Sequence, residues 1–174
     1  MQIRSESRIR YPRDQVYLAY RDRLPQIANY IPDIAAIVVH RREVTATGVT
    51  LHNEWIAARE IPAYAQPFVR PEHLRWDDYA DWNDGKYAVD YTLVTRVFPE
   101  AVKCSGTNAF VDDGAGTKVV LTGELTIDVT EIAGIPKFLA RSIGPRVERF
   151  VVSLITPNLE SVNASIERFL DAEG

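Results

Sequence analysis

The sequence contains little cysteine, methionine or histidine: one, one and three residues among 174. A single cysteine, Cys104, cannot form an internal disulfide, so a disulfide-stapled secreted fold is excluded and a reducing cytosol is the expected compartment. His40 and His52 fall on the two arms of one expected hairpin, and no third metal ligand accompanies them. No metal and no cofactor are therefore expected.

Long apolar runs, internal repeats and an excess of positive charge are also missing. No stretch approaches 18 apolar residues, and the first residues carry no hydrophobic signal core. Lysine and arginine total 20 against 24 for aspartate and glutamate, a net charge of -4, which argues against broad binding to nucleic acid. Apolar residues make up 46% and charged residues 25%, as is typical of a folded globular chain. We expect one domain over residues 1–174.

The first part of the chain predicts one strand and two short helices. Apolar and polar residues alternate weakly over residues 2–11, which indicates a strand. Apolar residues then recur at helical spacing from Val16 to Ile27, but Pro25 and Pro32 interrupt the run. Because proline breaks a helix interior, two short helices fit better than one long helix.

Between residues 34 and 129 the pattern changes to six antiparallel strands. Turn signals separate these strands at residues 45–48, 83–85 and 112–116. Asp84-Gly85 predicts a two-residue hairpin turn, because both positions of such a turn need a positive φ. Prolines rule out a central strand between residues 61 and 76. That stretch is a lid over a cavity, a contact for a partner or membrane surface, or a packed loop.

The last part of the chain predicts one long amphipathic helix from Gly144 to about Ala172. Gly144-Pro145 is expected to open it, and Pro157 is expected to kink or divide it. The sheet has one apolar face and the helix has one apolar stripe. Each can be buried only by packing against the other. A curved sheet around a single helix then encloses either large side chains or a cavity.

The order of these elements resembles the START and birch-pollen-allergen superfamily, also called SRPBCC. The resemblance covers essentially the whole chain, and its local signals are residues 11–17, 31–34, 116–125 and the terminal helix. It implies an α+β helix-grip fold, in which a curved antiparallel sheet of about seven strands wraps around a long C-terminal helix. Two short helices lie between strands 1 and 2 in this fold. The resemblance also implies an apolar cavity between sheet and helix, but no universal catalytic motif.

Seven residues are predicted to line this cavity and bind a ligand. They occupy the more apolar faces of the expected strands and the apolar stripe of the helix: Trp55, Trp76, Tyr91, Asn108, Leu125, Phe150 and Leu154. A mostly apolar pocket with a few orienting polar groups is typical of small-molecule sites. Tyr91 and Asn108 supply those groups. Gly106 and Gly123 are read as bends that widen the cavity or as bulges without function.

Other reactive side chains are given structural interpretations. Cys104 has no neighbouring base and is expected to be a buried, inert thiol. The acidic residues after Trp76 lack the spacing of a calcium loop, and a solvated hairpin is expected there instead: Asp77, Asp78, Asp81 and Asp84.

The predicted function is binding or carriage of a small hydrophobic molecule such as a lipid, polyketide or quinone-like compound. Few charged residues occupy the inward strand faces, whereas an enzyme gathers titratable groups there, so binding without chemistry is favoured. The alternatives are a cyclase, aromatase or dehydratase acting on a polyketide-like substrate oriented by Tyr91 and Asn108, or a chaperone-like interaction protein. Membrane contact, oligomeric state and the identity of the ligand are left open.

Overall fold

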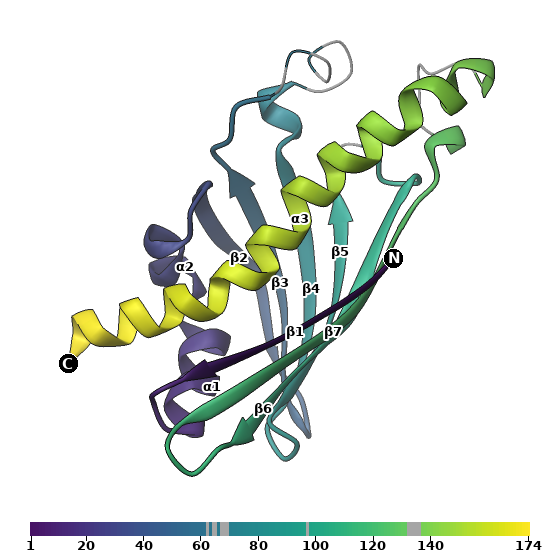
Figure 1. Ribbon diagram of the computed structural model, residues 1–174. Coiled ribbons are helices and arrows are strands. Elements are labelled where there is room, and N and C mark those ends of the chain that lie inside the picture. The colour runs from purple at the N-terminus through teal and green to yellow at the C-terminus, as the bar shows by residue number, and fades with distance from the viewer. Residues whose placement is uncertain (62, 64–65, 67–69, 97, 132–136) are drawn as a thin grey trace.

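A seven-stranded antiparallel sheet is crossed by one long helix (Figure 1). The computed structural model describes residues 1–61, 63, 66, 70–96, 98–131 and 137–174, with the backbone alone at 129, 137–143, 147, 154, 157–158 and 160. The strands lie in the order β1-β7-β6-β5-β4-β3-β2. Their bounds are β1 (Gln2–Ile9), β2 (Ile34–Val44), β3 (Gly48–Ala57), β4 (Arg75–Asn83), β5 (Ala88–Thr95), β6 (Val102–Asp112) and β7 (Thr117–Ile127).

The strand residues alternate between a buried inner face and an outer face. In β5, for example, Val89, Tyr91 and Leu93 are buried, whereas Asp90 and Thr92 are exposed. This period of two follows from the pleat of an extended chain. Helix α3 (Lys137–Glu173) covers the inner face, so the predicted pairing of an apolar sheet face with the terminal helix is confirmed.

Two short helices connect β1 to β2, as predicted. They are α1 (Arg13–Asp22) and α2 (Leu24–Ile27), and a 3-10 turn (Ala28–Tyr30) follows. Pro25 lies in the first turn of α2, where its missing N–H costs no helical hydrogen bond. Val16 and Ile27 are fully buried, so these helices close one end of the core.

Helix α3 begins seven residues earlier than the sequence predicts. Lys137 is its first residue, and Pro145 lies in its interior, so the prediction that Gly144-Pro145 opens the helix is wrong. A proline removes one backbone donor, at a cost of about 3 kcal/mol, but burial of Phe150 and Val151 just beyond it favours the helical state. The helix also continues through Pro157 without dividing. No helix in the described part of the chain is long and apolar enough to cross a bilayer.

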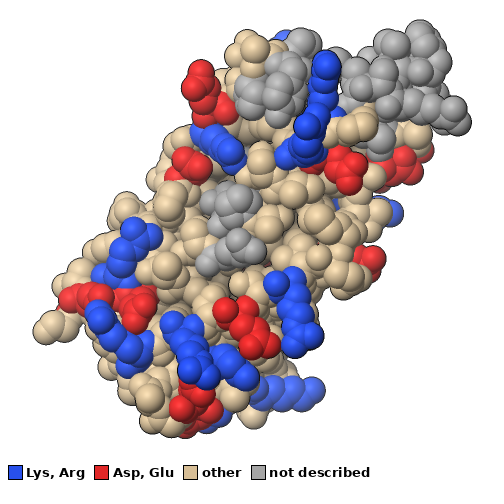
Figure 2. Space-filling view, in the orientation of Figure 1, with Lys and Arg blue, Asp and Glu red and all other residues tan. Residues whose placement is uncertain are grey.

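Ion pairs hold the C-terminal end of α3 against the first third of the chain. Arg10 contacts Asp171, and Arg23 contacts Glu173. Figure 2 shows side chains of both signs lying close together on this part of the surface. These pairs are exposed, so they contribute little to stability individually, but they agree with the direction in which α3 crosses the sheet.

The connection between β4 and β5 is wider than the predicted two-residue turn. Asn83 pairs with Ala88, which leaves four residues in the loop. Tyr87, not Gly85, adopts a positive φ, of 50°. Lys86 donates its backbone N–H to the carbonyl of Asn83 at 3.2 Å and to Oδ1 of the same residue at 3.0 Å. The Asn83 side chain therefore closes the loop.

Candidate functional site

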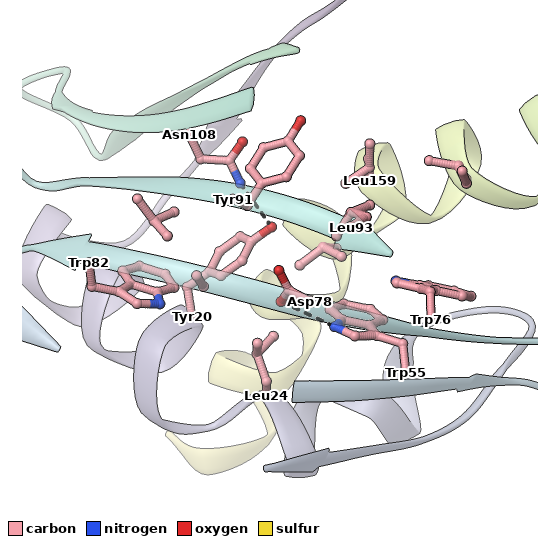
Figure 3. A pocket seen from close by; sticks show the side chains of 14 residues that line it. Tyr20, Leu24, Trp55, Trp76, Asp78, Trp82, Tyr91, Leu93, Asn108 and Leu159 are labelled. Atoms are coloured by element: carbon pink, nitrogen blue, oxygen red, sulfur yellow. Dashed lines mark hydrogen bonds between the residues drawn. The ribbon is translucent and has the colours of Figure 1, made fainter. Parts of the chain in front are cut away.

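A pocket lies between the inner face of the sheet and α3 (Figure 3). Strands β3 to β6 supply its floor, and α1, α2 and α3 supply its walls. Its lining residues are Tyr20, Leu24, Trp55, Trp76, Asp78, Ala80, Trp82, Val89, Tyr91, Leu93, Asn108, Ile155, Leu159 and Val162. The free space inside is about 40 Å³, and about 540 Å³ lies between the lining atoms when the open mouth is included.

Four of the seven predicted ligand-binding residues line this pocket. They are Trp55, Trp76, Tyr91 and Asn108. Trp55 and Trp76 pair directly across β3 and β4, and their rings stack with centroids 5.8 Å apart. Strand alternation alone places these residues on the inner face. That they contact a ligand stays a prediction.

The other three predicted residues do not extend the described lining. Leu125 and Phe150 are buried but are not among the residues that line the pocket. The side chain of Leu154 lies outside the described part of the chain. The residues of α3 that line the pocket include Ile155 and Leu159 instead.

Tyr91 lies across two glycines of the neighbouring strands. Tyr91 pairs with Gly106, and Gly106 pairs with Gly123. A Cβ atom at either glycine would come within 2.6 Å of the Tyr91 hydroxyl. The β6–β7 register is regular at this point, so the glycines are not bulges. They leave the space that the tyrosine ring occupies.

Several polar atoms in the pocket have no hydrogen-bond partner among the described residues. Asn108 donates from Nδ2 to the hydroxyl of Tyr20 at 3.3 Å, but its Oδ1 is unpaired. The Tyr91 hydroxyl and the indole N–H of Trp82 are also unpaired. Burial raises the pKa of Tyr20 and of Tyr91, so both stay neutral. Buried polar atoms without partners are costly to a fold unless a ligand or water pairs them.

Asp78 is the functional candidate that sequence reasoning missed. It was expected in a solvated hairpin, but only 7% of its surface is exposed and it lines the pocket. Asn53 Nδ2 and Trp55 Nε1 donate to the same carboxylate oxygen, Oδ2, at 3.2 and 3.3 Å. Burial raises the pKa of Asp78 from 3.8 to about 6, and those two hydrogen bonds oppose the rise. Side chains alternate along β4, so the pattern that places Trp76 on the inner face also places Asp78 there. This alternation is the sequence signal that could have identified Asp78.

A second, fully paired cluster lies on the outer face of the same strands. Asp77 accepts hydrogen bonds from His52 Nε2 at 2.7 Å and from Arg96 Nε at 3.0 Å. Glu54, its neighbour on β3, contacts His40 at 3.1 Å and Arg96 at 3.3 Å. Burial alone raises the pKa of Asp77, but the bonds from His52 and Arg96 outweigh it, so this pKa is lowered.

Within the described parts of the chain, the histidines and the cysteine lie in no cluster of metal-ligating side chains. His40 and His52 share the outer face with ring centroids 5.2 Å apart. No group of three metal-ligating side chains occurs among the described residues. Burial raises the pKa of Cys104 to about 11, with Asp78 adding to the rise, so the thiol is protonated at neutral pH.

The stretch from residue 61 to residue 76 is described only in part. Its apolar residues Tyr64, Phe68 and Val69 lie outside the described residues. Trp76 belongs to β4 and lines the pocket, and Arg75 contacts Glu54 on the outer face. The three interpretations of this stretch stay open.

Comparison with solved structures decides the fold. The Zhui aromatase/cyclase from Streptomyces sp. R1128 has a TM-score of 0.65 and 18% identity, with 100% of this chain and 98% of that chain covered. The chain has the helix-grip fold. Protein TTHA0849 from Thermus thermophilus has a TM-score of 0.66 and 20% identity over both whole chains. The STAR-related lipid transfer protein fragment from Xanthomonas axonopodis has a TM-score of 0.54 and 17% identity, covering 95% of this chain and 85% of that chain.

These comparisons confirm the predicted resemblance as a likeness of fold. No protein-family model matches the sequence, and no curated protein sequence matches it either. A helix-grip fold carries both binding proteins and enzymes, so function depends on the pocket of this chain.

Proposed function

We propose that the protein binds a small, mostly apolar molecule in the pocket between the sheet and α3. One observation carries this proposal: the pocket is walled by apolar and aromatic side chains and contains buried polar atoms without partners among the described residues. A folded protein whose pocket only filled its own core would pair or omit such atoms. The ligand classes are those expected from the sequence: a lipid, a polyketide or a quinone-like molecule.

The size of the pocket indicates how a ligand enters. Its free space of about 40 Å³ is less than the ~150 Å³ of an engineered cavity that holds benzene. A ring compound therefore enters by moving lining side chains apart. Leu159 of α3 is half-buried, so it moves at lower cost than the fully buried Ile155 beside it. Carriage of a ligand thus requires displacement of side chains on α3.

The similar structures support this proposal at the level of the fold. One is named as an aromatase/cyclase and another as a lipid transfer protein. Both names concern small molecules, in agreement with a ligand pocket here. A reducing cytosol remains the compartment that the single cysteine favours.

Binding of 2-methylnaphthalene, measured by titration calorimetry, tests the proposal. The wild-type protein should bind one equivalent. Leu159→Gln should weaken binding about tenfold, because it replaces an apolar contact in the pocket. Leu170→Gln is the matched control, since Leu170 is half-buried on the same helix and is not part of the pocket lining. Absence of binding to the wild type, or equal losses in both variants, would contradict the proposal.

The second candidate is an enzyme of the cyclase, aromatase or dehydratase type. Asp78 favours it, because a buried carboxyl group with a pKa of about 6 can take up and return a proton near neutral pH. Incubation with a linear poly-β-carbonyl compound, followed by mass spectrometry, tests this candidate. An enzyme yields a dehydrated product in the wild type and none in Asp78→Asn, whereas a carrier returns the compound unchanged.

A further inference from the structure

The carboxyl group of Asp78 is paired on one oxygen only. Asn53 and Trp55 both donate to Oδ2, and no described residue donates to Oδ1. Figure 3 shows Asp78 among the pocket side chains, with the indole of Trp55 on one side of the carboxyl group. Asp78 as a whole is only 7% exposed. Removing a carboxylate from water is costly unless its oxygens accept hydrogen bonds, so a ligand that donates to Oδ1 would stabilise the ionised group.

The pocket contains both acceptors and donors that have no partner among the described residues. Oδ1 of Asn108 is a buried acceptor without a partner among the described residues. Oδ1 of Asp78 is also an acceptor, and the hydrogen bonds that the described residues donate to this carboxylate go to Oδ2. The indole N–H of Trp82 is the one unpaired atom there that only donates, within the described lining. The Tyr91 hydroxyl can donate or accept a hydrogen bond. A complementary ligand therefore carries a group that donates to the acceptors of Asp78 and Asn108.

We propose that Asp78 selects ring compounds that carry a hydroxyl group over those whose polar group only accepts, and that this preference disappears when Asp78 takes up a proton. This inference rests on the proposed binding function. It goes beyond that function by naming the group of the ligand that is recognised and the atom that recognises it. The hydroxyl donates to Oδ1, and the ring lies against the tryptophans and leucines of the pocket.

The proton has one favourable position on Asp78. Because Asn53 and Trp55 donate to Oδ2, that oxygen stays an acceptor, and the proton lies on Oδ1. Protonation thus converts the pocket-facing oxygen from an acceptor into a donor. Burial raises the pKa of Asp78 to about 6, so this conversion takes place under mildly acidic conditions.

Few other groups near Asp78 change charge in this range. Tyr20 from α1, Tyr91 from β5 and Cys104 from β6 all have raised pKa values and stay neutral through pH 8. Leu24 from α2 and the α3 residues of the pocket are apolar. His52 lies on the opposite face of the sheet, bonded to Asp77, and its charge favours ionised Asp78.

Three probes of matched shape test the inference: 2-naphthol, 2-methoxynaphthalene and 2-methylnaphthalene. The hydroxyl group of 2-naphthol both donates and accepts hydrogen bonds. The ether oxygen of 2-methoxynaphthalene only accepts them, and the methyl group of 2-methylnaphthalene forms none. At pH 8 the wild type should bind 2-naphthol about tenfold more tightly than either analogue. Calorimetry at pH 8 and pH 5 gives all affinities. Asp81→Asn, at an exposed carboxylate on the same strand, is the control and should keep the preference.

The Asp78→Asn variant tests whether Oδ1 of Asp78 recognises the hydroxyl group or whether the pocket only favours polar compounds. Its amide oxygen accepts from Asn53 and Trp55, which turns the amide N–H group toward the pocket. The preference for 2-naphthol over 2-methoxynaphthalene should fall to about onefold at both pH values. A pH effect on the preference that originates at any group other than Asp78 would persist in this variant and would overturn the inference.

Each outcome has one meaning. Loss of the preference for 2-naphthol over 2-methoxynaphthalene at pH 5 in the wild type, and at both pH values in Asp78→Asn, supports the inference. Equal binding of all three probes to the wild type overturns it and leaves the proposed function intact. Binding of none overturns both. If Asp78→Asn does not fold, the pH comparison on the wild type decides alone.

Discussion

Asp77 and Asp78 are adjacent in β4 and almost equally buried, at 9% and 7% exposure, yet their surroundings are opposite. Asp77 faces the outer side, where His52 and Arg96 pair both of its oxygens. Asp78 faces the pocket, where two neutral donors share one oxygen. Burial raises the pKa of Asp78, whereas the partners of Asp77 lower its pKa despite burial.

The difference separates a carboxylate whose charge is paired from one whose charge is not, and only the second is a candidate for the proposed ligand site. A paired buried charge contributes to the fold and needs nothing more. An incompletely paired buried charge destabilises the protein, and such groups persist where a ligand or a reaction uses them. The two faces of β4 therefore place neighbouring carboxylates in different electrostatic surroundings.

The largest expected effect concerns the packing of the inner face. Ile155→Ala removes a fully buried side chain of α3 and should lower the free energy of unfolding by about 2–5 kcal/mol. Val94→Ala, at a half-exposed outer position, should change it by less than about 0.5 kcal/mol. Urea titration measures both. Equal losses would show that the inner and outer faces are not energetically distinct.

The next effect is a gain in stability. An Asp78 pKa of about 6, against 3.8, corresponds to a cost of about 3 kcal/mol for the ionised form. The folded state binds the proton more tightly, so stability falls as pH rises from 3.8 to about 6 and is then level. Asp78→Asn should therefore raise the free energy of unfolding by up to about 3 kcal/mol at pH 8 and little below pH 4. A loss at pH 8 would contradict this sign.

The same substitution at the neighbouring residue should act in the opposite direction. Asp77→Asn removes the charge that His52 and Arg96 pair, and it should lower the free energy of unfolding by about 1–2 kcal/mol at pH 8. Arg96 is half-exposed, so solvent screening keeps the loss modest. The folded pKa is lowered, so the stabilisation is present above 3.8 and is lost as pH falls through the folded pKa. Urea titrations at pH 2.5 provide the check. If Asp77→Asn lowers the free energy of unfolding as much at pH 2.5 as at pH 8, the loss does not come from the charge of Asp77.

The smallest expected effect is at Tyr91. Tyr91→Phe removes a buried hydroxyl without a partner among the described residues and keeps the ring over Gly106 and Gly123, so stability should rise by about 1 kcal/mol. Tyr79→Phe on the exposed outer face is the control and should stay within about 0.5 kcal/mol of wild type. Thermal unfolding followed by circular dichroism is sufficient. A clear loss at Tyr91 would mean that its hydroxyl is paired in solution.

Much of the fold could be predicted because its signals are local. Alternation along the strands placed Trp55, Trp76, Tyr91 and Asn108 inward, and all four line the pocket. The wider β4–β5 loop was not predicted, because the Asp84-Gly85 signal describes the turn but not the pairing of the strands on either side. The start of α3 differs from the prediction because burial of residues beyond Pro145 favours the helix despite the donor that this proline lacks.

The rest of the site depends on contacts between distant segments. Periodicity shows that Phe150 is buried, but the path of α3 across the sheet determines which helix residues reach the pocket. Asp78 was predicted to be solvated because aspartate is usually exposed, although strand alternation places it on the inner face. Its burial depends on Asn53 and Trp55, and the register that brings them to β4 is not written in the local sequence.

The contrast between the two neighbouring carboxyl groups is tested most directly by nuclear magnetic resonance. Carboxyl carbon shifts of Asp77 and Asp78, followed from pH 2 to pH 8 in one sample, report both pKa values together. Asp78 should titrate near pH 6 and Asp77 below 3.8, and saturation with 2-naphthol should lower the pKa of Asp78 alone. Titration of Asp78 at or below 3.8 would contradict the claim that the pocket contains a buried, incompletely paired carboxyl group.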